Sequence, residues 1–135
     1  MPVADTELLF LPNPRDPRHK YALRILEEMK GRILVPDVAL LEFEITLRSR
    51  SRSLSDIKLA LLALKKIFDD YEIKEVKTVN ILMLNRHIEI MMNYKLSFFD
   101  SLIASAALQV DGTIISDDVA YDQVIGLKRI PITKL

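Results

Sequence analysis

Short runs of aliphatic and β-branched residues alternate with longer amphipathic segments along this chain, and this alternation limits the possible folds more than any other feature. Runs such as residues 33–35 and 113–115 are too short for helices and suit buried strands. The segments between them carry apolar residues at helical spacing. Strands that alternate with helices favour a parallel sheet covered on both faces. We therefore predict an α/β fold with three α/β/α layers around a central parallel β-sheet.

The same patterns predict one domain over residues 1–135, a typical domain length. The first expected strand ends at Asp5, and the others span 33–35, 73–76, 113–116 and 128–130. Helices are expected at 18–30, 37–50, 54–71, 79–94 and 97–112, with a helical turn at 120–124. The proline-rich stretch 12–17 predicts a loop, because proline disfavours helix before it and removes a backbone donor.

Composition excludes several classes of function. Nineteen basic and nineteen acidic residues cancel, so only a local patch could attract nucleic acid. The absence of cysteine rules out disulfides, thiolate nucleophiles and cysteine-ligated metal clusters. No apolar run is long enough to cross a bilayer, and Asp5 and Glu7 stand where a signal peptide needs basic residues. We expect a cytoplasmic protein without a membrane partner.

Four acidic residues fall near the edge of the sheet where the carboxyl ends of the strands meet. Asp5 ends the first strand, and Glu42 lies just over a turn into the helix after the second. Asp100 lies in the first turn of a later helix, and Asp118 follows the strand at 113–116. Ligands of such folds bind at this edge, where the strand order reverses. Two carboxylates at ~4 Å repel by about 4 kcal/mol at an effective dielectric of about 20. A cluster there needs protons or a cation, and oxygen-only ligands favour Mg²⁺ or Mn²⁺.

Each acid also has a structural interpretation. Asp100 follows Ser97 by three residues, a spacing typical of a capping box, and an acid there suits the helix dipole. Asp117 and Asp118 suit a loop or a cap. Glu42 lies on an apolar side of its helix, where a solvated glutamate is not expected. Only the joint placement of the acids at one sheet edge favours the functional interpretation.

Four short segments stand in an order and spacing typical of one protein family. They are Val-Ala-Asp-Thr at 3–6, Leu-Val-Pro at 34–36 with Leu-Glu at 41–42, Ser-Phe-Phe-Asp-Ser-Leu-Ile-Ala-Ser-Ala-Ala at 97–107, and Ile-Ser-Asp-Asp-Val-Ala-Tyr at 115–121. Together they make the chain resemble the PIN-domain proteins of the VapC toxin-like group over essentially its whole length.

The resemblance implies a ribonuclease that hydrolyses RNA phosphodiester bonds with Mg²⁺ or Mn²⁺, and the positions of the four segments assign the members of its acidic quartet. It makes the following residues catalytic: Asp5, Glu42, Asp100 and Asp118, of which Asp5, Asp100 and Asp118 hold the metal. Thr6 and Ser116 are supporting hydroxyls, and Asp117 competes with Asp118 for the fourth acidic role. The resemblance also implies a homodimer and a cognate antitoxin protein whose tail blocks the site.

Arginines are the expected contacts to the RNA backbone, because guanidinium donors match phosphate oxygens in pairs. The candidates are Arg15, Arg48, Arg50 and Arg52. Apolar residues beyond one face of the helices at 38–50 and 54–71 independently favour a dimer.

Two other classes of protein fit parts of this pattern. A phosphoacceptor receiver domain is also doubly wound and acidic at its strand ends, but it needs a lysine soon after a late hydroxyl, and none follows Ser116 before Lys128. A non-catalytic RNA- or protein-binding PIN-like module would be expected to lose some of the acids, and here all four positions are filled.

Overall fold

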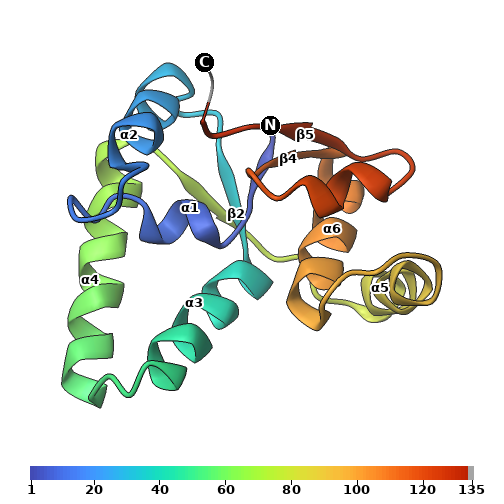
Figure 1. The fold of residues 1–135 in the computed structure, drawn as a ribbon, viewed down its shortest axis with the longest axis horizontal. Coiled ribbons are helices and arrows are strands. Elements are labelled where there is room, and N and C mark those ends of the chain that lie inside the picture. The colour runs from blue at the N-terminus through green and yellow to red at the C-terminus, as the bar shows by residue number, and fades with distance from the viewer. Residues whose placement is uncertain (134–135) are drawn as a thin grey trace.

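The computed structural model of the protein describes residues 1–133, which form one parallel sheet with helices on both sides (Figure 1). The five strands of this part of the chain pair in the order β3-β2-β1-β4-β5, and every pairing is parallel. Their bounds are β1 Val3–Ala4, β2 Leu34–Pro36, β3 Lys74–Val76, β4 Thr113–Ile115 and β5 Lys128–Ile130. The predicted three-layer α/β/α class with a central parallel sheet is confirmed.

The helices lie close to their expected positions. Their bounds are α1 Glu7–Phe10, α2 His19–Glu28, α3 Asp37–Ser49, α4 Leu54–Asp70, α5 Ile81–Asn93 and α6 Phe98–Val110, with the 3₁₀ turn η1 at Val119–Gln123. Figure 1 shows α1, α2 and α4 on one side of the sheet and α5 and α6 on the other. Within residues 1–133, no helix combines the length and the apolar character needed to cross a membrane.

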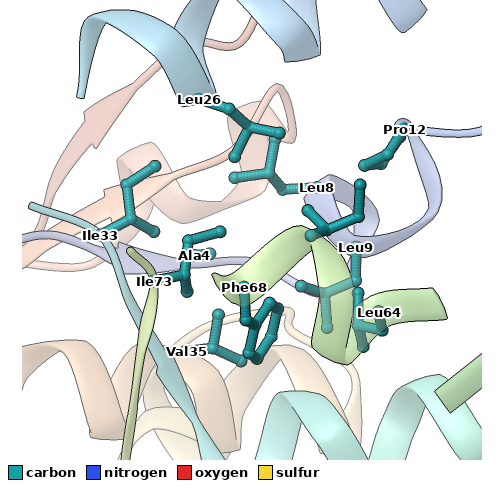
Figure 2. A pocket seen from close by; sticks show the side chains of 11 residues that line it. Ala4, Leu8, Leu9, Pro12, Leu26, Ile33, Val35, Leu64, Phe68 and Ile73 are labelled. Atoms are coloured by element: carbon teal, nitrogen blue, oxygen red, sulfur yellow. The ribbon is translucent and has the colours of Figure 1, made fainter. Parts of the chain in front are cut away.

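Helix α1 is the element that the sequence patterns did not predict. A single turn of four residues is too short to display a helical period, so its apolar run gives no signal of its own. Its buried residues Leu8 and Leu9 pack with side chains from β1, β2, α2 and α4, among them Leu26 and Phe68 (Figure 2). This packing fixes the direction in which the chain leaves β1, and the same turn carries Glu7.

Side chains at helix starts satisfy backbone donors that would otherwise be unpaired. Ser53, Asn80 and Ser97 each accept a hydrogen bond from the backbone N–H three residues later. Pro36 occupies the N-cap position of α3, and Asp37 is the first helical residue. Its carboxylate instead joins two segments of the chain.

The Asp37 carboxylate binds the loop between β3 and α5. It accepts hydrogen bonds from the backbone N–H groups of Val38, Thr78 and Val79, and from the Thr78 hydroxyl at 2.6 Å. The hydrogen bonds outweigh the effect of burial and hold the pKa of Asp37 below its usual value. The start of α3, which carries Glu42 one turn later, is therefore anchored to the sheet edge.

Replacement of Thr78 by valine tests this anchor. Thr78→Val keeps the shape of a buried side chain but removes the hydroxyl donor to Asp37. We expect the free energy of unfolding in urea to fall by about 1.5–3 kcal/mol, the usual contribution of a hydrogen bond to a charged group. Thr133→Val is the matched control, because its hydroxyl also donates to an aspartate, Asp117, but is exposed. Equal effects of the two substitutions would contradict the anchor.

The strand order places a reversal at the centre of the sheet. From β1 the chain goes to β2 and β3 on one side, and it returns to β4 and β5 on the other side. Val3 and Ala4 of β1 pair with Ile114 and Ile115 of β4. The loops that follow these two strands diverge around the reversal, and this is where open α/β sheets bind ligands.

Candidate active site

A cleft of about 240 Å³ opens beyond the carboxyl ends of β1 and β4. All four predicted catalytic acids line it, and so do four residues of which only Thr6 was expected. The lining residues are Asp5, Thr6, Glu7, Phe10, Glu42, Thr46, Asp100 and Asp118. Residues more than a hundred positions apart in the sequence therefore meet at one place.

Each acid reaches the cleft from a different element. Asp5 follows β1, and its backbone N–H continues the sheet by donating to Ile115 at 3.0 Å. Glu42 lies on α3, and Asp100 lies in the first turn of α6. Asp118 caps η1 by accepting from the Ala120 N–H at 2.9 Å. Three of these side chains are partly buried, and Asp5 is only 6% exposed.

Two hydroxyl groups link Asp5 to other carboxylates. The Tyr121 hydroxyl lies 3.2 Å from Asp5 Oδ1 and 3.2 Å from Asp100 Oδ1. The Ser116 hydroxyl lies 2.7 Å from Asp5 Oδ2 and 3.0 Å from Glu7 Oε1. Both oxygens of Asp5 therefore contact a hydroxyl that also contacts a second carboxylate.

Three of the four acids come close enough to share one cation. Carboxylate oxygens of Asp5, Glu42 and Asp100 lie within 4.8 Å of one another. Asp118 lines the same cleft but is not part of this set. The resemblance implied that Asp5, Asp100 and Asp118 hold the metal. In the structure, the three acids that converge include Glu42 in place of Asp118.

Asp117 points away from the cleft and binds the end of the described chain. Its Oδ1 accepts from the backbone N–H groups of Ile132 and Thr133, and its Oδ2 accepts from Arg18 at 3.2 Å. These hydrogen bonds keep the pKa of Asp117 low in spite of its burial. Of the two aspartates that compete for the fourth acidic role, Asp118 is the one that lines the cleft.

Burial, and to a smaller extent the charges of neighbouring acids, makes three carboxylates of the cleft hard to ionise. Burial raises the pKa of Asp5 to about 7, although the hydrogen bond from Ser116 opposes this change. Burial also raises the pKa of Glu42, and the charge of Asp100 adds to the effect. Burial likewise raises the pKa of Asp100, and the neighbouring charge of Asp118 contributes to the shift. Without a cation, Asp5 is therefore partly protonated near neutral pH.

The donor set fits a small divalent cation. Oxygen ligands without histidine or cysteine suit Mg²⁺ or Mn²⁺. Ligands on opposite sides of Mg²⁺ are about 4.2 Å apart at about 2.1 Å per bond. Neighbouring ligands lie about 3.0 Å apart at the same bond length, so three oxygens that already lie within 4.8 Å of one another are close to the spacing that one ion needs. The buried Thr6 hydroxyl lines the same cleft, and its contact with the Glu42 carboxylate partly offsets the rise that burial causes in the pKa of Glu42.

Glu7 and Arg18 belong to the site although sequence patterns did not select them. Glu7 Oε1 accepts from the Asp117 backbone N–H at 2.6 Å, and Glu7 Oε2 accepts from Arg18 at 3.2 Å. Arg18 also pairs with the Asp117 carboxylate, so one guanidinium ties α1 to the loop after β4. Contacts between residues 7, 18 and 117 follow no period, and no sequence pattern could have indicated them.

The four arginines expected to bind RNA lie in different surroundings. Arg15 is exposed in the loop between α1 and α2, and Arg48 forms an ion pair with Glu44 at 3.0 Å. The guanidinium of Arg50 lies 4.9 Å from the centre of the Phe10 ring, next to the acidic cleft. Arg52 lines a larger groove between α3 and α4. Of these four arginines, Arg50 is therefore the one that contacts a residue of the acidic cleft, Phe10.

The sequence matches the model of the PIN domain family over residues 3–127, so the chain belongs to the PIN-domain family. This assignment confirms the resemblance and removes the receiver-domain alternative. No curated protein matches the sequence.

Solved structures with the same fold share little sequence with the chain. VapBC2 from Rickettsia felis, bound to a promoter DNA fragment, has a chain that is 16% identical with a TM-score of 0.71, and the match covers 96% of both chains. A toxin–antitoxin complex from Klebsiella pneumoniae is 13% identical with a TM-score of 0.71 and full coverage of both chains. VapC20 from Mycobacterium tuberculosis, a toxin that cleaves the sarcin–ricin loop, is 16% identical with a TM-score of 0.71, covering 91% of this chain and 94% of its own.

The raised pKa of Asp5 predicts how stability depends on pH when metal is absent. Folded Asp5 keeps its proton up to about pH 7, while the unfolded chain releases it near pH 4. Over this window the folded state binds more protons, so its stability falls as pH rises, and the effect levels off above pH 7. Asn at position 5 has no proton to lose.

We therefore expect the melting temperature of the protein in EDTA to drop by several degrees between pH 5 and pH 8 relative to that of Asp5→Asn. Thermal melts of both proteins across this range measure the difference. A constant difference between them would show that Asp5 has an ordinary pKa.

Proposed function

We propose that the protein is a Mg²⁺- or Mn²⁺-dependent endoribonuclease and the toxin of a toxin–antitoxin pair. One observation carries the proposal: the carboxylates of Asp5, Glu42 and Asp100 converge in one cleft of a PIN-domain fold. Nuclease activity is general in this family, and the oxygen-only donor set accounts for the choice of metal. VapC20, the toxin that cleaves the sarcin–ricin loop, supports RNA as the substrate class.

A bound cation would supply a water of lowered pKa and would offset the negative charge that builds on the phosphate. The residues of the chain supply the geometry. Hydroxyl contacts from Ser116 and Tyr121 fix the Asp5 carboxylate, and the ends of β1 and β4 hold it against the sheet. Glu42 and Asp100 enter from two helices, so their spacing depends on rigid elements and not on a loop. Asp118 is the fourth of the predicted catalytic acids that line the cleft.

The RNA backbone needs cationic groups beside the acidic cleft, because the chain has no net charge. A second cleft of about 220 Å³ shares Glu7 and Phe10 with the first and is also lined by Arg18 and Arg50. We propose that phosphates flanking the cleaved bond lie here. Arg50 is the better candidate for direct contact, because Arg18 is already paired with three carboxylates.

An antitoxin segment has a suitable groove next to this path. A groove of about 520 Å³ lies among α1, α3 and α4, and its floor includes Phe43, Leu47 and Leu64. Arg50 and Arg52 also line it. We propose that it receives an apolar peptide with acidic flanks from the cognate antitoxin, in keeping with the toxin–antitoxin complexes among the similar structures.

Replacement of Asp100 separates a metal ligand from a helix cap. Asp100→Asn removes one charge from the cluster and keeps the shape, so the metal-free protein should be at least as stable as the parent. We expect the variant to lose most RNA cleavage and much of the melting shift that Mn²⁺ gives the parent. Cleavage assays and melts with and without Mn²⁺ measure these effects, and the parent should be inactive in EDTA.

The chain offers a closely matched control. Asp56 stands in the first turn of α4, three residues after the cap Ser53, as Asp100 stands after Ser97. Asp56 is exposed and remote from the cleft, so Asp56→Asn should leave cleavage and the Mn²⁺ shift unchanged. If Asp100→Asn behaves like Asp56→Asn, Asp100 has only a structural role. Equal cleavage by the pure parent protein in EDTA would contradict the metal-dependent mechanism.

We also propose a homodimer, formed through the outer face of α5. Exposed apolar residues occur on α3 and α4, as the sequence indicated, but α5 presents a longer stripe: Ile81, Leu84, Ile88 and Met91. These positions recur at helical spacing and flank the buried residues of the same helix, Met83, His87 and Ile90, about a third of a turn away around the helix axis. A stripe of this kind on one face is typical of an interface between copies of a chain.

Light scattering at micromolar concentration tests the dimer. We expect the parent, of 15.5 kDa per chain, to show twice that mass. Ile88→Glu should convert it to a monomer, because a charge would be buried at the centre of the interface. Lys58→Glu, an exposed change on α4, is the control. A monomer mass for the parent without its partner would count decisively against the proposal.

A further inference from the structure

Tyr121 lies directly beneath the acidic cleft without lining it. Its side chain is 0% exposed, and its ring is part of the hydrophobic core. The 3₁₀ turn η1 places it, and the Tyr121 backbone N–H donates to Asp118 at 3.3 Å. Because the cleft is lined by other residues, Tyr121 cannot touch a substrate there. Its hydroxyl nevertheless contacts two of the three carboxylates that converge.

The two contacts of the hydroxyl cannot be alike. A tyrosine hydroxyl has one proton to donate, and its oxygen can accept a second hydrogen bond. Asp5 Oδ1 and Asp100 Oδ1 each lie 3.2 Å from this oxygen. Burial and the two neighbouring carboxylates raise the pKa of Tyr121, so the hydroxyl stays protonated. It donates to one carboxylate, and the contact with the other is favourable only when that group carries a proton or when a cation offsets its charge.

We propose that Tyr121 is a positioning residue, whose hydroxyl holds Asp5 and Asp100 at the spacing and orientation at which they bind the divalent cation. The proposal rests on the proposed function for the identity of that cation. Asp5 Oδ1 has one other donor, the Thr6 backbone N–H at 2.8 Å, which fixes the carboxylate on its own strand. Tyr121 adds the contact that relates it to Asp100 on α6. Partners of this kind typically contribute 10–100-fold to metal affinity or activity.

Tyr121→Phe isolates the hydroxyl, since the phenylalanine ring fills the same space in the core. We expect the variant to fold, as judged by circular dichroism, and to bind Mn²⁺ about 10–100-fold more weakly than the parent in a direct titration. Cleavage should fall at low Mn²⁺ and recover at saturating Mn²⁺. If the hydroxyl only stabilised the fold, saturating Mn²⁺ would not restore cleavage by the variant.

Tyr94→Phe is the matched control. Its hydroxyl accepts a hydrogen bond from the Ile125 N–H at 3.3 Å, so this substitution also removes a tyrosine hydroxyl contact, but one that involves none of the acids. Its Mn²⁺ affinity should equal that of the parent. In a double-mutant cycle, the effect of Tyr121→Phe on Mn²⁺ affinity should shrink when Asp100→Asn is already present, because the two groups act together.

The outcomes separate this proposal from the proposed function. Mn²⁺ affinity of Tyr121→Phe within twofold of the parent would overturn the positioning role. Failure of the variant to fold would also overturn it, because the hydroxyl would then serve the fold. If the parent binds Mn²⁺ but cleaves no RNA, the proposed function fails while the titrations still decide the role of Tyr121. If the parent binds no Mn²⁺, the proposed function and the positioning role of Tyr121 are both wrong.

Discussion

The contacts of Asp5 are the interaction on which the rest of the site depends. Its backbone N–H extends the pairing of β1 with β4, so the residue is fixed at the centre of the sheet. Its two carboxylate oxygens contact the hydroxyls of Tyr121 and Ser116, which in turn contact Asp100 and Glu7. A displacement of Asp5 would therefore also disturb the contacts of Asp100 and Glu7. The sheet fixes the backbone of Asp5, and the two hydroxyls fix its carboxylate relative to those of Asp100 and Glu7.

The molecule tolerates this crowding because neighbouring residues compensate part of the charge. Arg18 pairs with both Glu7 and Asp117, and the backbone N–H groups of Ile132 and Thr133 satisfy Asp117 further. The four other acids of the cleft, Asp5, Glu42, Asp100 and Asp118, form no ion pair with a cationic side chain of residues 1–133. Their charge is left for protons or a metal to neutralise. Sites with strongly perturbed carboxylates are often functional for this reason.

Much of the fold could be predicted because it rests on periodic patterns. Strand and helix positions follow from alternation and helical spacing, and the placement of Asp5, Glu42 and Asp100 at one edge follows from parallel topology. The site's other parts do not repeat along the sequence. The single turn α1 has no period, and the contacts of Glu7 and of Tyr121 join residues 109 and 116 positions away. Adjacent aspartates 117 and 118 look equivalent in sequence, and only the direction of their side chains distinguishes them.

The long sequence separation within the sheet has a consequence for synthesis. β1 contains the first paired residues of the chain, yet its partner β4 begins at Thr113. A ribosome adds about 5–20 residues per second, and pairings between distant segments form late because a long loop must close first. The Asp5 carboxylate therefore lacks its two hydroxyl contacts until Ser116 and Tyr121 have been synthesised. The nascent protein therefore assembles its acidic cleft only after residues 113–121 have been synthesised and have paired with β1.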